Sequence, residues 1–169
     1  MGNPILRHKT HPLTVKEIQS PEIQRLIDNM IETMREYEGV GLAAPQVHEL
    51  KRLTVIEMAE NPKYPQKGEI PLTILINPVI TPLTKEKELG WEGCLSIPDL
   101  RGKVPRYTKI QVHAFDRHGK ELNFKADGFF SVVIQHETDH LDGILFLDRM
   151  EDFSTLTYLN EYARYWMEQ

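Results

Sequence analysis

The chain has 169 residues, a length that suits one domain with a hydrophobic core of its own. Hydrophobic residues make up 40% of the sequence and charged residues 27%, which is typical of a soluble globular protein. The formal net charge of −5 gives the protein no overall positive field, so we predict neither a direct nucleic-acid site nor attraction to anionic lipid.

The N-terminal region, residues 1–12, lacks the apolar core of a signal peptide and offers no lipidation motif. No apolar run elsewhere approaches the length of a membrane span. Cys94 is the only cysteine, so an internal disulfide is impossible and a reducing compartment is favoured. We therefore expect a soluble protein of the cytoplasm, with no membrane partner.

The first predicted element is a helix that starts at residue 21. Ser20 followed by Pro21 is typical of a helix start, with an N-cap and then proline at the first helical position. Gly39 is expected to end the helix. Apolar residues recur between these points at helical spacing, which predicts a helix that faces the core: Ile23, Leu26, Ile27, Met30, Met34 and Tyr37.

Short runs rich in β-branched and other apolar residues follow, and they predict strands at residues 53–56, 72–76, 110–115 and 144–147. Residues 61–71 contain three prolines and a glycine, which predicts a surface loop. A second helix is expected from about residue 129 to residue 142. Asp127 or Gly128 lies near its start, and Gly143 lies at its end.

A third helix is predicted within residues 152–167, where Leu156, Leu159, Tyr162, Ala163 and Trp166 recur at helical spacing. Strands that lie between a first helix and two later helices favour an α+β fold over alternating strand and helix units. We predict one domain over residues 1–169, in which small antiparallel sheets pack around the second helix. An N-terminal helix and a C-terminal helical tail, residues 151–169, complete this fold.

The strongest chemical signal is the pentad His-Glu-Thr-Asp-His at residues 136–140 of the second helix. Histidines four residues apart share one helix face, so both imidazoles can reach one metal ion. Glu137 lies one step round the helix and is placed to exchange protons rather than to bind the metal. A solvated polar helix edge is the alternative. Against it, apolar residues lie three, four and seven positions before His136, namely Val133, Val132 and Phe129, and unpaired imidazoles are costly to bury there.

A third ligand is needed for tight metal binding, and known peptidase patterns and the remaining residues can be searched for it. The peptidase pattern HExxHxxGxxH is met by Gly143, but Phe146 occupies the place of its third histidine. Glu161 could act as a downstream carboxylate, yet it lies on an ordinary amphipathic helix. Cys94 remains. A thiolate beside two imidazoles suits iron(II), zinc, nickel or cobalt.

Two glycine-containing segments lie upstream of the pentad. Cys94 is set in Glu-Gly-Cys-Leu-Ser at residues 92–96, where Gly93 allows close approach of the backbone. Residues 39–46 read Gly-Val-Gly-Leu-Ala-Ala-Pro-Gln, a strip of small residues. Taken alone, this strip is read as a turn between helix and strand. Its amides could also pair with an extended peptide, as an added strand does.

The three segments at residues 39–46, 92–96 and 135–140 resemble the signature motifs of peptide deformylases, in the same order and at similar spacing. The resemblance extends from about residue 4 to residue 148. It implies a hydrolase that removes the N-formyl group from the formylmethionine of newly made polypeptides and releases formate. It also implies one divalent metal ion, with iron(II) as the native metal and zinc, nickel or cobalt as metals that the same ligands accept.

The family's roles carry over to matching residues. Cys94, His136 and His140 are implied as the metal ligands, and Glu137 is implied as general base and then general acid. The side-chain amide of Gln46 and the backbone N–H of Leu95 are implied to form the oxyanion hole. Arg106 is expected to pair with Glu92, and Arg101 is expected near the peptide. The substrate-binding residues implied are Gly39, Val40, Gly41, Glu92, Gly93, Arg101, Phe129, Val132 and Val133.

The expected partners are N-formylmethionyl nascent peptides and, transiently, the ribosome. Some deformylases are thought to dock on the ribosome through a basic C-terminal helix, and this chain departs from that pattern. Residues 151–169 carry four acidic residues and one arginine, a net charge of −3. RNA would repel such a tail. We therefore expect its aromatic residues to pack on the domain or on a second subunit.

Two other functions remain open on sequence grounds. One is a zinc endopeptidase that uses His136, His140 and Glu161. The other is a structural metal site that a fourth protein ligand closes. The histidines outside the pentad have no ligand spacing to it, so the sequence identifies no fourth ligand.

Overall fold

The computed structural model describes residues 1–58 and 68–167, and most of the predicted loop at 61–71 lies outside these residues. Within the described residues, the strands form a five-stranded and a three-stranded sheet. The helices are α1 (Val15–Ile18), α2 (Pro21–Glu36), α3 (Gly128–Leu141), α4 (Phe146–Arg149) and α5 (Leu159–Tyr165). The predicted α+β fold is confirmed.

The five-stranded sheet is antiparallel throughout. Its spatial order is β1 (Gly41–Ala43), β2 (Leu53–Met58), β3 (Ile70–Pro82), β6 (Lys109–Phe115) and β7 (Glu121–Asp127). The short strand β1 is therefore an edge strand. The strands predicted at 53–56, 72–76 and 110–115 fall within β2, β3 and β6.

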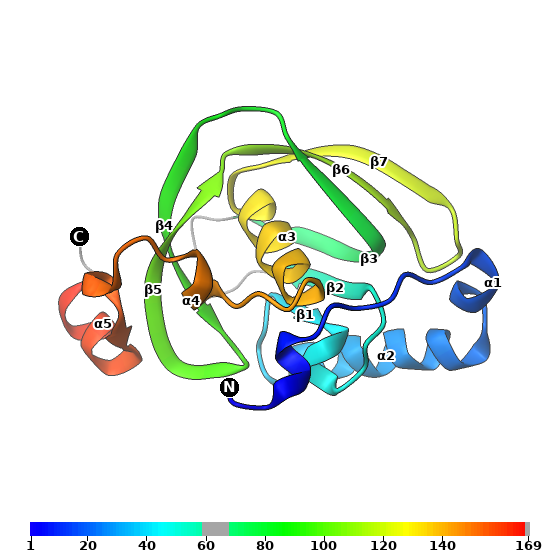
Figure 1. Ribbon diagram of the computed structural model, residues 1–169, viewed down its shortest axis with the longest axis horizontal. Coiled ribbons are helices and arrows are strands. Elements are labelled where there is room, and N and C mark those ends of the chain that lie inside the picture. The colour runs from blue at the N-terminus through cyan, green and yellow to red at the C-terminus, as the bar shows by residue number, and fades with distance from the viewer. Residues whose placement is uncertain (59–67, 168–169) are drawn as a thin grey trace.

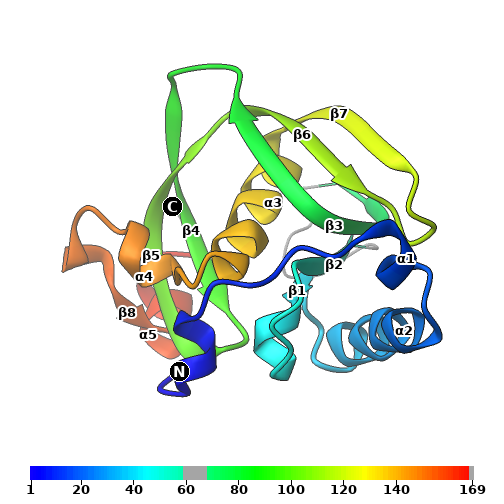
Figure 2. The same ribbon diagram turned by 45° about the vertical axis from the view of Figure 1, so that its right-hand side comes forward.

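The three-stranded sheet consists of a long hairpin and a short third strand. Strands β4 (Lys87–Cys94) and β5 (Ile97–Tyr107) form the hairpin, and β8 (Thr157–Tyr158) adds to the outer edge of β5. Helix α3 lies in the middle of the molecule, between this hairpin and the large sheet (Figures 1 and 2). This placement covers α3 on several sides, and Ile134 and Leu141 are fully buried.

Helix α2 forms where the sequence predicts it. The side chain of Ser20 accepts a hydrogen bond from the backbone N–H of Ile23 at 3.3 Å, and Pro21 occupies the first turn. Its apolar stripe is buried, with Ile27 and Met30 at 0% exposure. At the other end, the backbone N–H of Gly39 donates to the carbonyl of Met34 at 2.8 Å, which closes the helix.

Residues 144–147 do not form the predicted strand, because α4 begins there. The backbone N–H of Leu145 donates to Oδ2 of Asp148 at 2.7 Å, which caps a helical turn. Phe146 is 1% exposed and packs in an apolar cluster that includes Leu6, Ile97 and Val104. A short apolar run does not distinguish a strand from a buried helical turn, so the prediction was wrong here.

Residues 152–167 do not form the single third helix that the sequence predicts. A 3-10 turn (Phe153–Thr155) leads into β8, and α5 follows. Strand β8 pairs Tyr158 with Leu100 and Thr157 with Arg101, so pairing with β5 overrides the helical pattern in the first half of the segment. No helix in the described part of the chain has the length and apolar character of a membrane span.

Candidate metal centre and catalytic cleft

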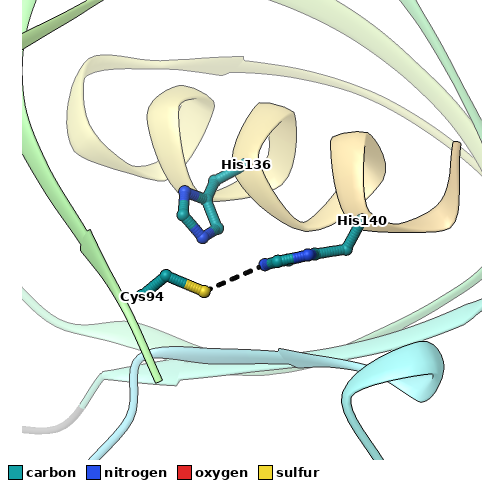
Figure 3. Close-up of side chains that lie close together, drawn as sticks. All are labelled: Cys94, His136 and His140. Carbon is teal, nitrogen blue, oxygen red and sulfur yellow. Dashed lines mark hydrogen bonds between the residues drawn. The ribbon is translucent and has the colours of Figure 1, made fainter. Parts of the chain in front are cut away.

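Helix α3 and strand β4 bring together the three predicted metal ligands. His136 and His140 project from α3 toward Cys94, which ends β4 (Figure 3). Sγ of Cys94 lies 3.2 Å from Nε2 of His140, and the potential donor atoms of all three residues lie within 4.8 Å of one another. Among residues 1–58 and 68–167, no fourth histidine, cysteine or carboxylate joins this group.

A buried ion network holds this group from behind. Arg106 makes a bidentate contact with Glu92, at 2.7 Å and 3.0 Å, as the sequence predicts. Its Nη1 also donates to Asp139 at 2.6 Å, and Arg149 contacts the other side of that carboxylate. Oε2 of Glu92 lies 2.8 Å from Nδ1 of His136. Since a side-chain partner fixes Nδ1, the His136 ring is oriented with Nε2 as its free ligand atom.

The charges around the site favour a bound cation. Burial raises the pKa of Glu92, but hydrogen bonds with His136 and Arg106 outweigh burial and lower the pKa to about 2. Burial lowers the pKa of His136, yet hydrogen bonds with Cys94 and Glu92 raise it well above its ordinary value. Burial lowers the pKa of His140 well below its ordinary value, which leaves the neutral imidazole that metals bind. Because the charged Glu92 carboxylate lies 2.8 Å from Nδ1 of His136, it also attracts a cation bound by that ring. The donor set and the charge therefore fit a divalent metal.

Glu137 lies against strand β1, next to the three donors. It is 4% exposed, and a Cβ atom placed on Gly41 would lie 2.4 Å from its Oε1. Glycine at position 41 therefore permits this close approach. Burial raises the pKa of Glu137 to about 7, although His136 lowers it. A carboxyl group with this pKa can gain and lose a proton near neutral pH.

Gln46 faces the thiol from the other side. It belongs to a 3-10 turn, Ala44–Val47, and its Oε1 accepts a hydrogen bond from the backbone N–H of Ala43 at 2.8 Å. This contact points Nε2 toward Cys94, where it lies 3.7 Å from Sγ and donates to Oγ of Ser96 at 3.1 Å. The backbone N–H of Ser96 also donates to Sγ, at 3.4 Å. The side-chain amide of Gln46 and the backbone N–H of Ser96 are therefore both directed at the sulfur.

The site opens into a cavity of about 410 Å³. Every residue predicted to bind substrate lines this cavity: Gly39, Val40, Gly41, Glu92, Gly93, Arg101, Phe129, Val132 and Val133. Gln46, Cys94, Leu95, His136 and Glu137 line it as well. A Cβ atom on Gly93 would lie 2.2 Å from Nη1 of Arg101, so this glycine makes room for the arginine that borders the cleft.

Six residues to which the sequence assigned no role in the site also line the cavity: Tyr37, Glu38, Trp91, Pro98, Asp99 and Leu159. Most of them lie close in sequence to a motif, and that proximity could have indicated them. Leu159 has no such neighbour. The sequence also missed the role of Asp139, which is part of the pentad and joins Arg106 to Arg149.

Glu161, the alternative third ligand, does not join the three donors, because it lies exposed on α5. The group of possible metal ligands contains Cys94 in its place. This arrangement disfavours the endopeptidase ligand set. The site also keeps an open side toward the cavity, as catalytic metal sites do and closed structural sites do not.

Comparison with known proteins identifies close relatives. Residues 1–155 match the family described as polypeptide deformylase. The chain is 47% identical over 158 residues to peptide deformylase 2 of Pseudomonas putida. These 158 residues make up 94% of this chain and 89% of that protein. The chain is 46% identical, with the same coverage, to peptide deformylase 1 of Bordetella pertussis. A class I type b peptide deformylase from Acinetobacter baumannii, crystallised with Met-Ala-Ser bound, has a TM-score of 0.85 at 39% identity, over 89% of this chain and 94% of that chain.

Proposed function

The chain belongs to the polypeptide deformylase family and removes the formyl group from the N-terminal methionine of newly made polypeptides, and on this basis we propose which residues carry the reaction. Cys94, His136 and His140 hold the catalytic metal. The observation that carries this proposal is the convergence of their donor atoms within 4.8 Å at the wall of a cavity. Iron(II) is the native metal, and zinc, nickel or cobalt can replace it because all four accept sulfur and imidazole ligands.

When bound, a divalent metal supplies Lewis acidity and lowers the pKa of water. Glu137 accepts the proton of the attacking water and later delivers it to the leaving amine. Its burial next to the histidines and its close contact with Gly41 support this role, because they hold the carboxylate at one position. The products are formate and a free N-terminal amine.

Gln46 and the backbone N–H of Leu95 stabilise the negative charge that develops on the formyl oxygen. The fixed orientation of the Gln46 side chain supports this assignment, since the N–H of Ala43 holds Oε1 and leaves Nε2 directed at the site. Leu95 directly follows Cys94 and lines the same cavity as Gln46.

The substrate binds as an extended peptide along the edge strand β1, in the manner of an added strand. The methionine side chain enters the apolar part of the cavity formed by Val40, Phe129, Val132 and Val133. The Met-Ala-Ser bound to the Acinetobacter baumannii relative supports a cleft with room for three residues. Arg101, packed against Gly93, borders the path of the peptide.

A substrate made on ribosomes favours the cytoplasm as the compartment of this enzyme, with a transient encounter with the ribosome. The single cysteine is in keeping with a reducing compartment. The acidic tail gives such an encounter no basic segment for contacts with RNA phosphates.

Two variants test these roles separately. Cys94→Ala is expected to lose the metal on dialysis, whereas Glu161→Ala, the matched control, keeps it. Glu137→Gln is expected to keep the metal and to lose several orders of magnitude in turnover, because this residue moves protons and does not bind the metal. Elemental analysis and formate release measure the two properties. Full metal retention in Cys94→Ala, or metal loss in Glu137→Gln, contradicts the assignment.

A further inference from the structure

We infer that the C-terminal segment, residues 156–167, forms one wall of the substrate cleft and that Leu159 selects apolar side chains in the residues that follow the formylmethionine. The inference rests on the proposed function and deepens it. The family match ends at residue 155, so α5 lies beyond the matched part of the chain. Leu159, the first residue of α5, nevertheless lines the same cavity as Glu137 and Cys94.

Backbone pairing fixes the start of this segment beside the cleft. Strand β8 pairs Thr157 with Arg101 and Tyr158 with Leu100. Arg101 itself lines the cavity, so the tail is hydrogen-bonded to a strand that forms the cleft. Leu159 follows β8 directly. The pairing of β8 with β5 therefore fixes the position of Leu159.

Aromatic packing fixes the remainder of the segment. The ring of Tyr162 packs against Trp91 with centroids 4.9 Å apart, and the ring of Trp166 packs on Trp91 at 5.3 Å. The amine of Lys103 lies 5.3 Å from the Trp91 ring and 5.6 Å from the Trp166 ring. Both views of the molecule place α5 beside the β4–β5 hairpin (Figures 1 and 2).

Trp91 joins this packing to the site. It lines the cavity and directly precedes Glu92, the partner of His136. The tail therefore contributes Leu159 to the cleft and also supports Trp91 in the cleft wall. Because Trp91 and Leu159 are both half-buried, each keeps surface that a substrate can cover.

The chemistry of this wall indicates what it selects. The methionine side chain is assigned to Phe129, Val132 and Val133 on α3, whereas Leu159 and Trp91 come from the opposite sheet and the tail. They are placed to contact later residues of an extended peptide. Since both are apolar, they favour an apolar residue at the second or third substrate position over a polar one.

The test is a panel of formylated substrates. The panel contains formyl-Met amide and formyl-Met tripeptides with Phe, Ser or Lys at position two or three. For the wild type, kcat/KM is expected to favour Phe over Ser about tenfold at one of these positions, as a hydrophobic contact allows. Leu159→Ser should reduce this preference for Phe over Ser at least threefold, with each rate expressed relative to that of the same variant on formyl-Met amide. Leu159→Asp should raise the relative rate for Lys at the same position.

Tyr165→Ser is the matched control, because Tyr165 lies on α5, is 55% exposed and is not part of the cavity wall. Its substrate ratios should equal those of the wild type. A Leu159 variant that leaves both ratios unchanged, or lowers all substrates equally, overturns the inference. A wild-type enzyme that releases no formate from any substrate contradicts the proposed function, and the inference with it.

Discussion

Substitution of Gly41 by alanine tests how closely β1 and α3 approach each other. The added Cβ would lie 2.4 Å from Oε1 of Glu137, 2.7 Å from Cδ and 2.8 Å from Cγ, whereas ordinary contact begins at 3.4 Å. The carboxyl end of Glu137 must therefore move by about 1 Å. Since a side-chain end can move more easily than backbone, the protein should still fold. Its free energy of unfolding should fall by about 1–3 kcal/mol because of overpacking.

A displacement of about 1 Å in a catalytic group lowers the rate by roughly 100-fold, and this is the expected loss in kcat for Gly41→Ala. Metal content should not change, because Glu137 is not a ligand. Formate release, elemental analysis and thermal melting measure the three properties. Gly90→Ala is the matched control, since Gly90 lies in β4 with nothing within 4 Å of an added Cβ. If kcat of Gly41→Ala stays within twofold of wild type, Glu137 does not act from the position described.

Other regions of the molecule give three further predictions. Arg106→Leu leaves the carboxylates of Glu92 and Asp139 without their buried partner and should lower the free energy of unfolding in urea by about 3–5 kcal/mol. A loss below about 1 kcal/mol would show that the network contributes little. Iron-loaded enzyme should lose activity in air, because iron(II) and the thiolate ligand both oxidise, while nickel-loaded enzyme keeps it longer. Equal half-lives argue against iron(II) as the oxygen-sensitive component. Trp166→Ala removes an aromatic contact with Trp91 and should lower the melting temperature by about 2–4 °C without changing ribosome co-sedimentation at low salt. Loss of co-sedimentation at unchanged stability would show that the tail binds the ribosome.

The elements that local signals specify could be predicted from the sequence. Helix α2 has its cap at Ser20, its proline at position 21 and a periodic apolar face, and each signal lies within the helix itself. Helix α3 has no side-chain cap at Asp127, but its pentad places two histidines four residues apart, the spacing of one helix face. For this reason His136 and His140 could be identified as neighbours without knowledge of the fold.

The β4–β5 hairpin could not be predicted, because its residues carry weak strand signals. The run from 87 to 107 contains glycines at 90, 93 and 102 and prolines at 98 and 105, which normally indicate turns. The hairpin depends on pairing between its two strands, from Lys87 opposite Tyr107 to Cys94 opposite Ile97. Cys94 was nevertheless identified correctly as a neighbour of the histidines, on the basis of its motif.

The C-terminal wall of the cleft depends on contacts that no local pattern shows. The apolar spacing of residues 152–167 predicts a helix, but Thr157 and Tyr158 form β8 instead because they can pair with β5. The position of Leu159 then follows from the end of that strand. Only the fold places this residue near a site whose motifs end at His140.

The most direct test of the central assignment is formate release from formyl-Met-Ala-Ser by metal-loaded enzyme, measured together with cleavage of an internal peptide bond in the same substrate. The wild type should release one formate for each new N-terminal amine and leave the peptide bonds intact. Glu137→Gln, at full metal content, should release almost none. Cleavage of an internal bond, or full formate release by metal-loaded Glu137→Gln, would contradict the assignment of Cys94, His136, His140 and Glu137 as a deformylase site.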